Sequence, residues 1–163
     1  MSNTNTGTLA AVNLETGEAT TIPTGARPQG TVFSRDQKTM YVTNSEANTI
    51  SIVDVGKFQV IGTIQTGKWP CRLALTPDGK SLVYALQNSE AVGFADLAAK
   101  KEVKQVPLGG KLVSLTLSSD GRYAYSSAQE QDKIFVISLA GQKVVRVIET
   151  PKGSGPDPVI ALR

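Results

Sequence analysis

A tandem repeat of 42 residues runs through this chain and limits the folds that it can adopt. Aspartates recur at this step at Asp36, Asp78 and Asp120, and because they repeat at one structural position we expect them to shape turns. A glycine recurs too, with its fourth copy displaced by a two-residue insertion: Gly25, Gly67, Gly109 and Gly153. A fixed period of this length indicates stacked copies of one supersecondary unit.

Each unit holds four short runs rich in Val, Ile and Thr, separated by turn residues. In one copy these runs are residues 31–34, 40–43, 49–53 and 60–64. Such runs predict four antiparallel strands, which we name A to D from the inside outward. The fold class is therefore all-β, a β-propeller of four-stranded antiparallel blades with about four repeats. A β-sandwich is the alternative, but its strands need no identical period.

The chain is interpreted as one propeller or partial propeller domain over residues 1–163. The repeats run approximately over 1–25 (partial), 26–67, 68–109, 110–153 and 154–163 (partial). We expect inner strands near 30–34, 72–76, 114–118 and 158–162. Three assemblies fit this layout: half of a larger ring, two chains that close one ring, and one chain that closes alone. The open strand edges favour the first two, a fragment or a homo-dimer.

Two gaps in the composition exclude several chemistries. The chain has no histidine, which removes His-based triads and His–metal sites. Its single cysteine, Cys71, allows no internal disulfide and no Cys-x-x-Cys pair. We therefore expect no metal site and no cofactor, and we interpret Cys71 as a small buried residue. No apolar run is long enough for a membrane helix, and the first residues lack the pattern of a signal peptide.

Tyr41-Val42-Thr43-Asn44 carries a family resemblance. With Gly25-x-x-Pro28 before it and residues 48–54 after it, this segment resembles the YVTN-type β-propeller repeat family, found in YncE-like and surface-layer-like propellers. The resemblance covers nearly the whole chain, although other copies replace the signature asparagine by Leu86 and Ala128. It implies a periplasmic or cell-envelope protein with ligand sites at the mouth of the central channel.

The D–A loops, which join strand D of one blade to strand A of the next, lie at that mouth. They carry basic residues and one aromatic, and the predicted ligand-binding residues are Arg27, Gln29, Lys68, Trp69, Arg72, Lys111 and Asp157. Guanidinium and ammonium groups beside an indole suit an anion, or a stacked base next to a phosphate. The opposite face is also basic, through Lys80, Arg122 and others, so charge alone selects neither face.

Two function classes follow. The first is a non-enzymatic binding or scaffold module that recognises a small molecule or a protein at the D–A loop face, with single-stranded nucleic acid as one candidate ligand. The second is a hydrolase of the lactonase-like propeller type. Its candidate contributors are Arg27, Arg72, Glu46, Glu90 and Asp157. Because no nucleophile stands beside a histidine base, the binding module is the preferred interpretation and no catalytic residue is assigned.

Overall fold

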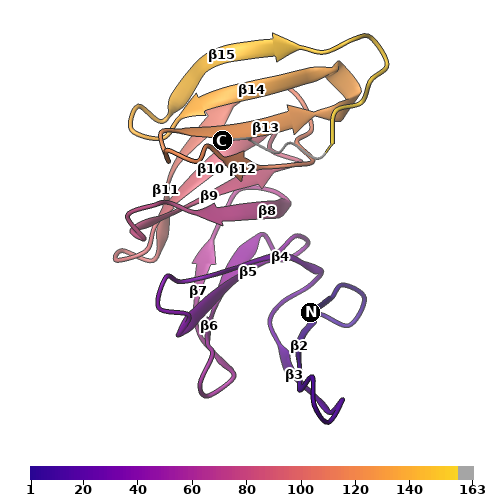
Figure 1. Ribbon diagram of the computed structural model, residues 1–163, viewed down its shortest axis with the longest axis vertical. Helices are drawn as coiled ribbons and strands as arrows, with labels where there is room; N and C mark the ends of the chain where they lie inside the picture. The colour runs from indigo at the N-terminus through magenta and orange to yellow at the C-terminus, as the bar shows by residue number, and fades with distance from the viewer. Residues whose placement is uncertain (158–163) are drawn as a thin grey trace.

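The computed structural model describes residues 1–157 as four antiparallel sheets in chain order (Figure 1). The first sheet contains β1 (Ser2–Asn3), β2 (Thr8–Val12) and β3 (Ala19–Pro23). The second contains β4 (Pro28–Phe33), β5 (Thr39–Asn44), β6 (Thr49–Asp54) and β7 (Gln59–Gln65). The third contains β8 (Pro70–Leu75), β9 (Ser81–Leu86), β10 (Ala91–Asp96) and β11 (Lys101–Pro107). The fourth contains β12 (Thr116–Leu117), β13 (Tyr123–Ala128), β14 (Lys133–Ser138) and β15 (Lys143–Glu149).

These sheets are the blades of a partial β-propeller, which confirms the predicted fold class. Within the second, third and fourth sheets the strands pair in sequence order, as in a meander. Figure 1 shows the first and last blades at opposite ends of the molecule, so the described part does not close a ring. Residues 1–157 contain no helix of the length and apolar character needed to cross a membrane; their one helical segment is the 3-10 turn η1 (Gln129–Gln131).

The inner strands agree with the sequence prediction in two blades and differ in one. Strands β4 and β8 include all but the last residue of the predicted ranges 30–34 and 72–76, whereas β12 is reduced to Thr116–Leu117 within the predicted 114–118. Just before the shortened strand, the Ser114 carbonyl accepts the Ser126 hydroxyl at 2.7 Å, and the Ser114 hydroxyl bonds that of Ser127 at 2.6 Å. Side-chain bonds thus replace part of the backbone ladder. The predicted inner strand 158–162 lies outside the described residues.

The recurring aspartates shape turns, as expected from their spacing. Asp36 accepts the Ser34 hydroxyl at 2.6 Å and the backbone N–H of Lys38 at 3.1 Å. The same pair of bonds recurs at Asp78 and at Asp120. These hydrogen bonds favour the ionised form and lower the pKa of all three carboxyls, that of Asp120 to about 2, where Arg122 adds a further bond.

A β-bulge interrupts each of the two long inner strands at the same repeat position. In the β4–β5 pairing the register shifts between Pro28 and Thr31, and in β8–β9 between Pro70 and Leu73. The two residues inside each shift have no ladder partner, so their backbone groups must bond elsewhere.

In the second blade, the Thr43 hydroxyl satisfies this need. It accepts the backbone N–H of Gly30 at 2.8 Å and lies 2.8 Å from the carbonyl of Cys71, to which it donates. Because Cys71 belongs to the next blade, one buried hydroxyl ties the bulge of β4 to β8. Gly30 makes this approach possible, since a Cβ there would collide with the Cys71 carbonyl.

Elsewhere in the N-terminal half, similar hydroxyl-to-carbonyl bonds join one blade to the inner strand of the next. Ser45 donates to the Pro70 carbonyl at 2.7 Å, and Ser2 of the first blade donates to the Gln29 carbonyl at 2.9 Å. The third blade carries Ala85 at the position of Thr43 and has no such hydroxyl. There the Cys71 sulfur approaches the Leu112 carbonyl at 3.8 Å. The polar link is therefore replaced by a weaker one between the third and fourth blades.

Apolar side chains fill the space between neighbouring blades. One buried cluster joins the second and third blades through Ile50, Ile64 and Tyr84, and another joins the third and fourth through Phe94 and Phe135. Burial of such side chains stabilises each by about 1.5–3 kcal/mol, so the blades depend on their neighbours for stability.

Replacing Thr43 by Val keeps the side-chain shape but leaves the Gly30 N–H and the Cys71 carbonyl without their partner. Orphaned buried polar groups cost about 1–3 kcal/mol each, so we expect Thr43→Val to lower the free energy of unfolding by that amount or more. Thermal denaturation should show a drop in Tm of roughly 3–10 °C.

The matched control is Thr31→Val on the same sheet. Thr31 is exposed, so its free energy of unfolding should change by less than about 0.5 kcal/mol. Equal losses in the two variants would contradict the linking role of Thr43.

Candidate ligand-binding site

A cavity of about 290 Å³ lies where the D–A loops meet the starts of the inner strands. Its walls come from three inner strands or the segments that lead into them and from the end of the described chain. The lining residues are Arg27, Gln29, Trp69, Cys71, Arg72, Gln87, Leu112, Val113 and Asp157. Five of these, Arg27, Gln29, Trp69, Arg72 and Asp157, belong to the predicted ligand-binding set.

The repeat explains why distant residues meet in this cavity. Gln29, Cys71, Val113 and Asp157 occupy one equivalent position in four successive repeats, directly after the start of strand A. Neighbouring inner strands bring these positions together around the channel mouth. The next residue is the second residue of the bulge, and in the third blade it is Arg72, whose exposed side chain lines the cavity.

Arg27 and Trp69 form one wall of the cavity. Both have left-handed backbone conformations, with φ of 60° and 61°, and each precedes a buried proline, Pro28 or Pro70. The Arg27 guanidinium lies 5.4 Å from the centre of the Trp69 ring, a cation–π distance. It also pairs with Glu46 at 3.5 Å. Since both side chains of this ion pair are about half exposed, the pair is a weak restraint.

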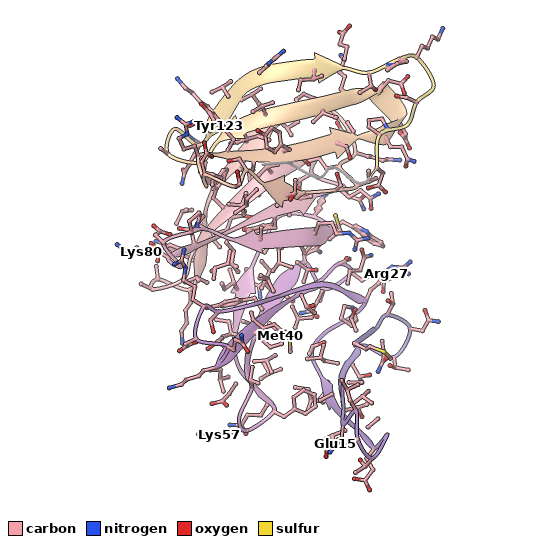
Figure 2. The ribbon with its side chains drawn as sticks, viewed as in Figure 1. Glu15, Arg27, Met40, Lys57, Lys80 and Tyr123 are labelled. Carbon is pink, nitrogen blue, oxygen red and sulfur yellow. The ribbon has the colours of Figure 1, made fainter. Side chains whose placement is uncertain are left out.

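The remaining predicted residues lie outside the cavity. Lys111 pairs with Glu130 at 3.7 Å on the exposed surface, and the exposed Lys68 does not line the cavity. Glu90, a candidate for the hydrolytic alternative, is also exposed and outside it. Figure 2 shows Arg27 and Lys80 at opposite edges of the molecule, which separates the D–A loop face from the other basic face.

The cavity combines positive charge with one carboxylate. None of the ion pairs within residues 1–157 uses Arg72, so its guanidinium donors face solvent and the cavity. Arg27 supplies a second guanidinium, Asp157 a carboxylate and Gln29 an amide. Planar guanidinium groups match the geometry of a carboxylate or a phosphate. Within the same residues, no cluster of three or more His, Cys, Asp or Glu side chains has the arrangement of a metal site.

Cys71 lines the cavity with a buried thiol, 5% exposed. Burial raises the pKa of this thiol above its usual value and outweighs Arg72, whose backbone hydrogen bond and charge lower it; the Asp157 carboxylate adds a smaller increase. The net increase in pKa disfavours the thiolate, which is the nucleophilic form. The thiol therefore packs against the wall as a small apolar group, in agreement with its interpretation from the sequence.

Sequence reasoning missed Gln87, Leu112 and Val113 as wall residues. None of them is charged, and Leu112 and Val113 are apolar, whereas the search followed charge. The available signal was the repeat itself, because aligning the residues two after Arg27 in each copy identifies Val113 with Gln29 and Cys71.

The chain is similar to known β-propellers in sequence and in structure. A family model described as lactonase, 7-bladed beta-propeller, matches residues 2–104, well over half of the chain. The solved structure of Kuenenia stuttgartiensis hydrazine synthase matches 91% of this chain with a TM-score of 0.81 and 24% sequence identity. The match covers 45% of that chain, so this chain spans less than half of its length. At this identity the likeness shows the fold alone. No curated protein matches the chain.

The buried thiol predicts slow chemistry at Cys71. At pH 7.5 we expect the folded protein to react with a thiol reagent at least tenfold more slowly than the unfolded chain, because burial both shields the sulfur and raises its pKa. Absorbance of a chromogenic disulfide reagent measures the rate, and guanidinium chloride supplies the unfolded control. Rapid stoichiometric labelling of the folded protein would overturn the buried assignment.

Proposed function

The chain belongs to the lactonase family of 7-bladed β-propellers, and from this membership we propose that its mouth cavity binds a small organic anion. The cavity volume of about 290 Å³ is near the lower end of the range for small-molecule sites, about 300–1,000 Å³. Its position at the mouth of the inner strands agrees with the preference of ligands for such openings.

The main support for anion binding is the positive charge that Arg72 and Arg27 bring to the cavity. The exposed Arg72 guanidinium stands on a bulge beside the Arg27–Trp69 wall, free of ion pairs within the described residues. Such a group bonds a carboxylate or phosphate with two parallel N–H donors. Gln29 and Asp157 add groups that can bond ligand hydroxyls. The site therefore suits a hydroxylated acid of limited size.

The finer family assignment rests on one repeat. We propose that the units are of the YVTN type, because Tyr41–Asn44 contains the buried Thr43 link described above. Asn44, also fully buried, donates to the hydroxyls of Thr49 and Ser51. These bonds give the Thr and Asn of the signature a structural role.

Lactone hydrolysis is the second candidate function, and family membership favours it. A lactone presents an ester carbonyl to the same cavity. Asp157 would take a proton from water as the water oxygen adds to the carbonyl carbon. Arg72 would stabilise the oxyanion. When the ring C–O bond breaks, Asp157 would return the proton to the departing alkoxide. The product acid would then leave as an anion of the class proposed above.

Trp69 is the only tryptophan of the chain and gives a direct signal for binding. We expect phosphate or citrate to change its fluorescence in a saturable way. Arg72→Gln should weaken the affinity about tenfold or more, because it removes a charged hydrogen-bond donor. A fluorescence titration measures both proteins, with Lys80→Gln on the opposite face as the control.

The outcomes separate the candidates. No saturable change with either anion would overturn the binding proposal, and equal losses in the two variants would show that the ligand uses another surface. Acid release from a simple lactone, abolished by Asp157→Asn and by Arg72→Gln, would establish the hydrolase instead. Saturable binding of a single-stranded oligonucleotide, weakened by salt, would identify nucleic acid as the ligand.

We further propose that this chain works within a larger assembly, as a homo-dimer or with the rest of a larger propeller. A cavity of about 500 Å³ between the first two blades is lined mainly by apolar side chains, including Met40 and Phe58. Its exposed members Met1, Val12 and Phe33 are 77%, 41% and 49% accessible. An exposed apolar surface of this kind favours association.

Sedimentation should reveal this association in the isolated chain. At micromolar concentration we expect species larger than a monomer, and Phe33→Asp should shift them toward the monomer because it places a charge on the apolar cavity wall. An exposed substitution away from the cavity, Lys143→Asp in the fourth blade, serves as the control. A monomer at every concentration tested would contradict self-association.

A further inference from the structure

The D–A loop before β8 is held more tightly than its counterparts. Each of its four consecutive amides donates to an acceptor outside the loop. The pairs are Thr66 with the Asn48 carbonyl at 3.0 Å, Gly67 with the Glu102 carboxylate at 3.1 Å, Lys68 with the Ser89 hydroxyl at 2.7 Å, and Trp69 with the Asn48 side-chain oxygen at 2.9 Å. Every backbone N–H of this loop, from Thr66 to Trp69, is therefore hydrogen-bonded to a residue outside the loop.

Trp69 needs this support because its backbone is in a costly conformation. Its φ of 61° lies in the left-handed region, which bulky side chains rarely adopt. Strain of this kind persists only where surrounding groups determine the conformation, and it concentrates at binding sites. Asn48 supplies two of the four acceptors. Its carbonyl bonds the first amide of the loop, that of Thr66, and its side-chain oxygen bonds the last, that of Trp69.

The repeat offers an internal comparison for Asn48. Its position has positive φ in every blade: Gly7, Asn48, Glu90 and Asp132. In each, the backbone carbonyl accepts an amide from the following D–A loop. Only Asn48 and Asp132 also use the side chain, Asn48 toward Trp69 and Asp132 toward the equivalent Gly155 at 2.9 Å. The side chain of Glu90 accepts no amide within residues 1–157.

We propose that Asn48 is a positioning residue of the mouth cavity, which fixes Trp69 as a rigid aromatic wall before a ligand arrives. The inference rests on the proposed function for its ligand, but the geometry that it explains is that of the free protein. Asn48 does not line the cavity and acts only through the Trp69 backbone.

If Trp69 is fixed, the Arg27 side chain is the part of this cavity wall that can move. The Arg27 guanidinium stacks on the indole at 5.4 Å, and within residues 1–157 its one further ionic partner is the exposed Glu46. An anion in the cavity can therefore draw Arg27 away from Glu46 while the indole stays in place. Binding then requires ordering of one arginine side chain rather than of the whole loop, which preserves affinity.

Asn48→Gly tests the proposal without adding backbone strain. Glycine accepts positive φ and keeps the carbonyl bond to Thr66, but it removes the acceptor for Trp69. Glu90→Gly is the matched control, since it makes the same change one repeat later. Asn48→Asp keeps an acceptor and tolerates the left-handed conformation, so it should rescue the loop.

The readout is the fluorescence of Trp69 in the ligand-free proteins. We expect Asn48→Gly to raise acrylamide quenching and to lower the anisotropy, while Glu90→Gly and Asn48→Asp resemble the unmodified protein. Phosphate affinity should fall about two- to tenfold in Asn48→Gly alone. The Tm of Asn48→Gly should fall only by the share of one lost hydrogen bond, and both glycine variants should remain folded at the temperature of the fluorescence measurements, which separates positioning of Trp69 from general unfolding.

Unchanged quenching and anisotropy in Asn48→Gly would overturn the inference, whatever the ligand. Equal changes in Glu90→Gly would overturn it as well, since they would reflect the glycine rather than the lost acceptor. If the unmodified protein does not bind phosphate, but Asn48→Gly still raises the quenching and lowers the anisotropy of Trp69, the proposed ligand class is wrong and the positioning role of Asn48 is supported.

Discussion

The close approach of successive inner strands is the constraint on which the rest of this structure depends. Gly30 brings β4 against the Cys71 carbonyl of β8, and the buried Thr43 hydroxyl bonds both strands at once. Apolar clusters between the blades supply the larger stabilising free energy, but the hydrophobic effect is non-directional and does not select one relative orientation of the blades. A hydrogen bond depends on distance and angle, so the Thr43 hydroxyl fixes how one blade packs on the next.

The mouth cavity is a consequence of this contact. Because β4 and β8 meet at their bulges, the bulge residues of both strands lie together there, and the exposed Arg72 lines the cavity beside them. The same convergence places Gln29 beside Cys71, one on each strand. The site is therefore assembled at the junctions between blades, and no single repeat contains it.

Rigidity in this site is unevenly distributed. Asn48, Ser89 and Glu102 hold the backbone before β8, so Trp69 stays in a left-handed conformation that it would otherwise leave. Arg27 has the same backbone conformation with only an exposed ion pair and the indole face to hold its side chain. A rigid aromatic wall with an adjustable cation suits recognition of small anions that differ in shape.

The sequence by itself determined the repeat, the strands and the turn role of Asp36 and its equivalents, because these depend on neighbours within a few residues. It also placed Arg27, Trp69 and Arg72 on one face, since that follows from topology. Only the tertiary structure decided that Lys111 pairs away from the cavity and that Asn48 holds Trp69 from 21 residues upstream. Those outcomes depend on the distances and directions between blades, which side-chain packing and the bulges set. The pattern of residues within one repeat does not contain this information.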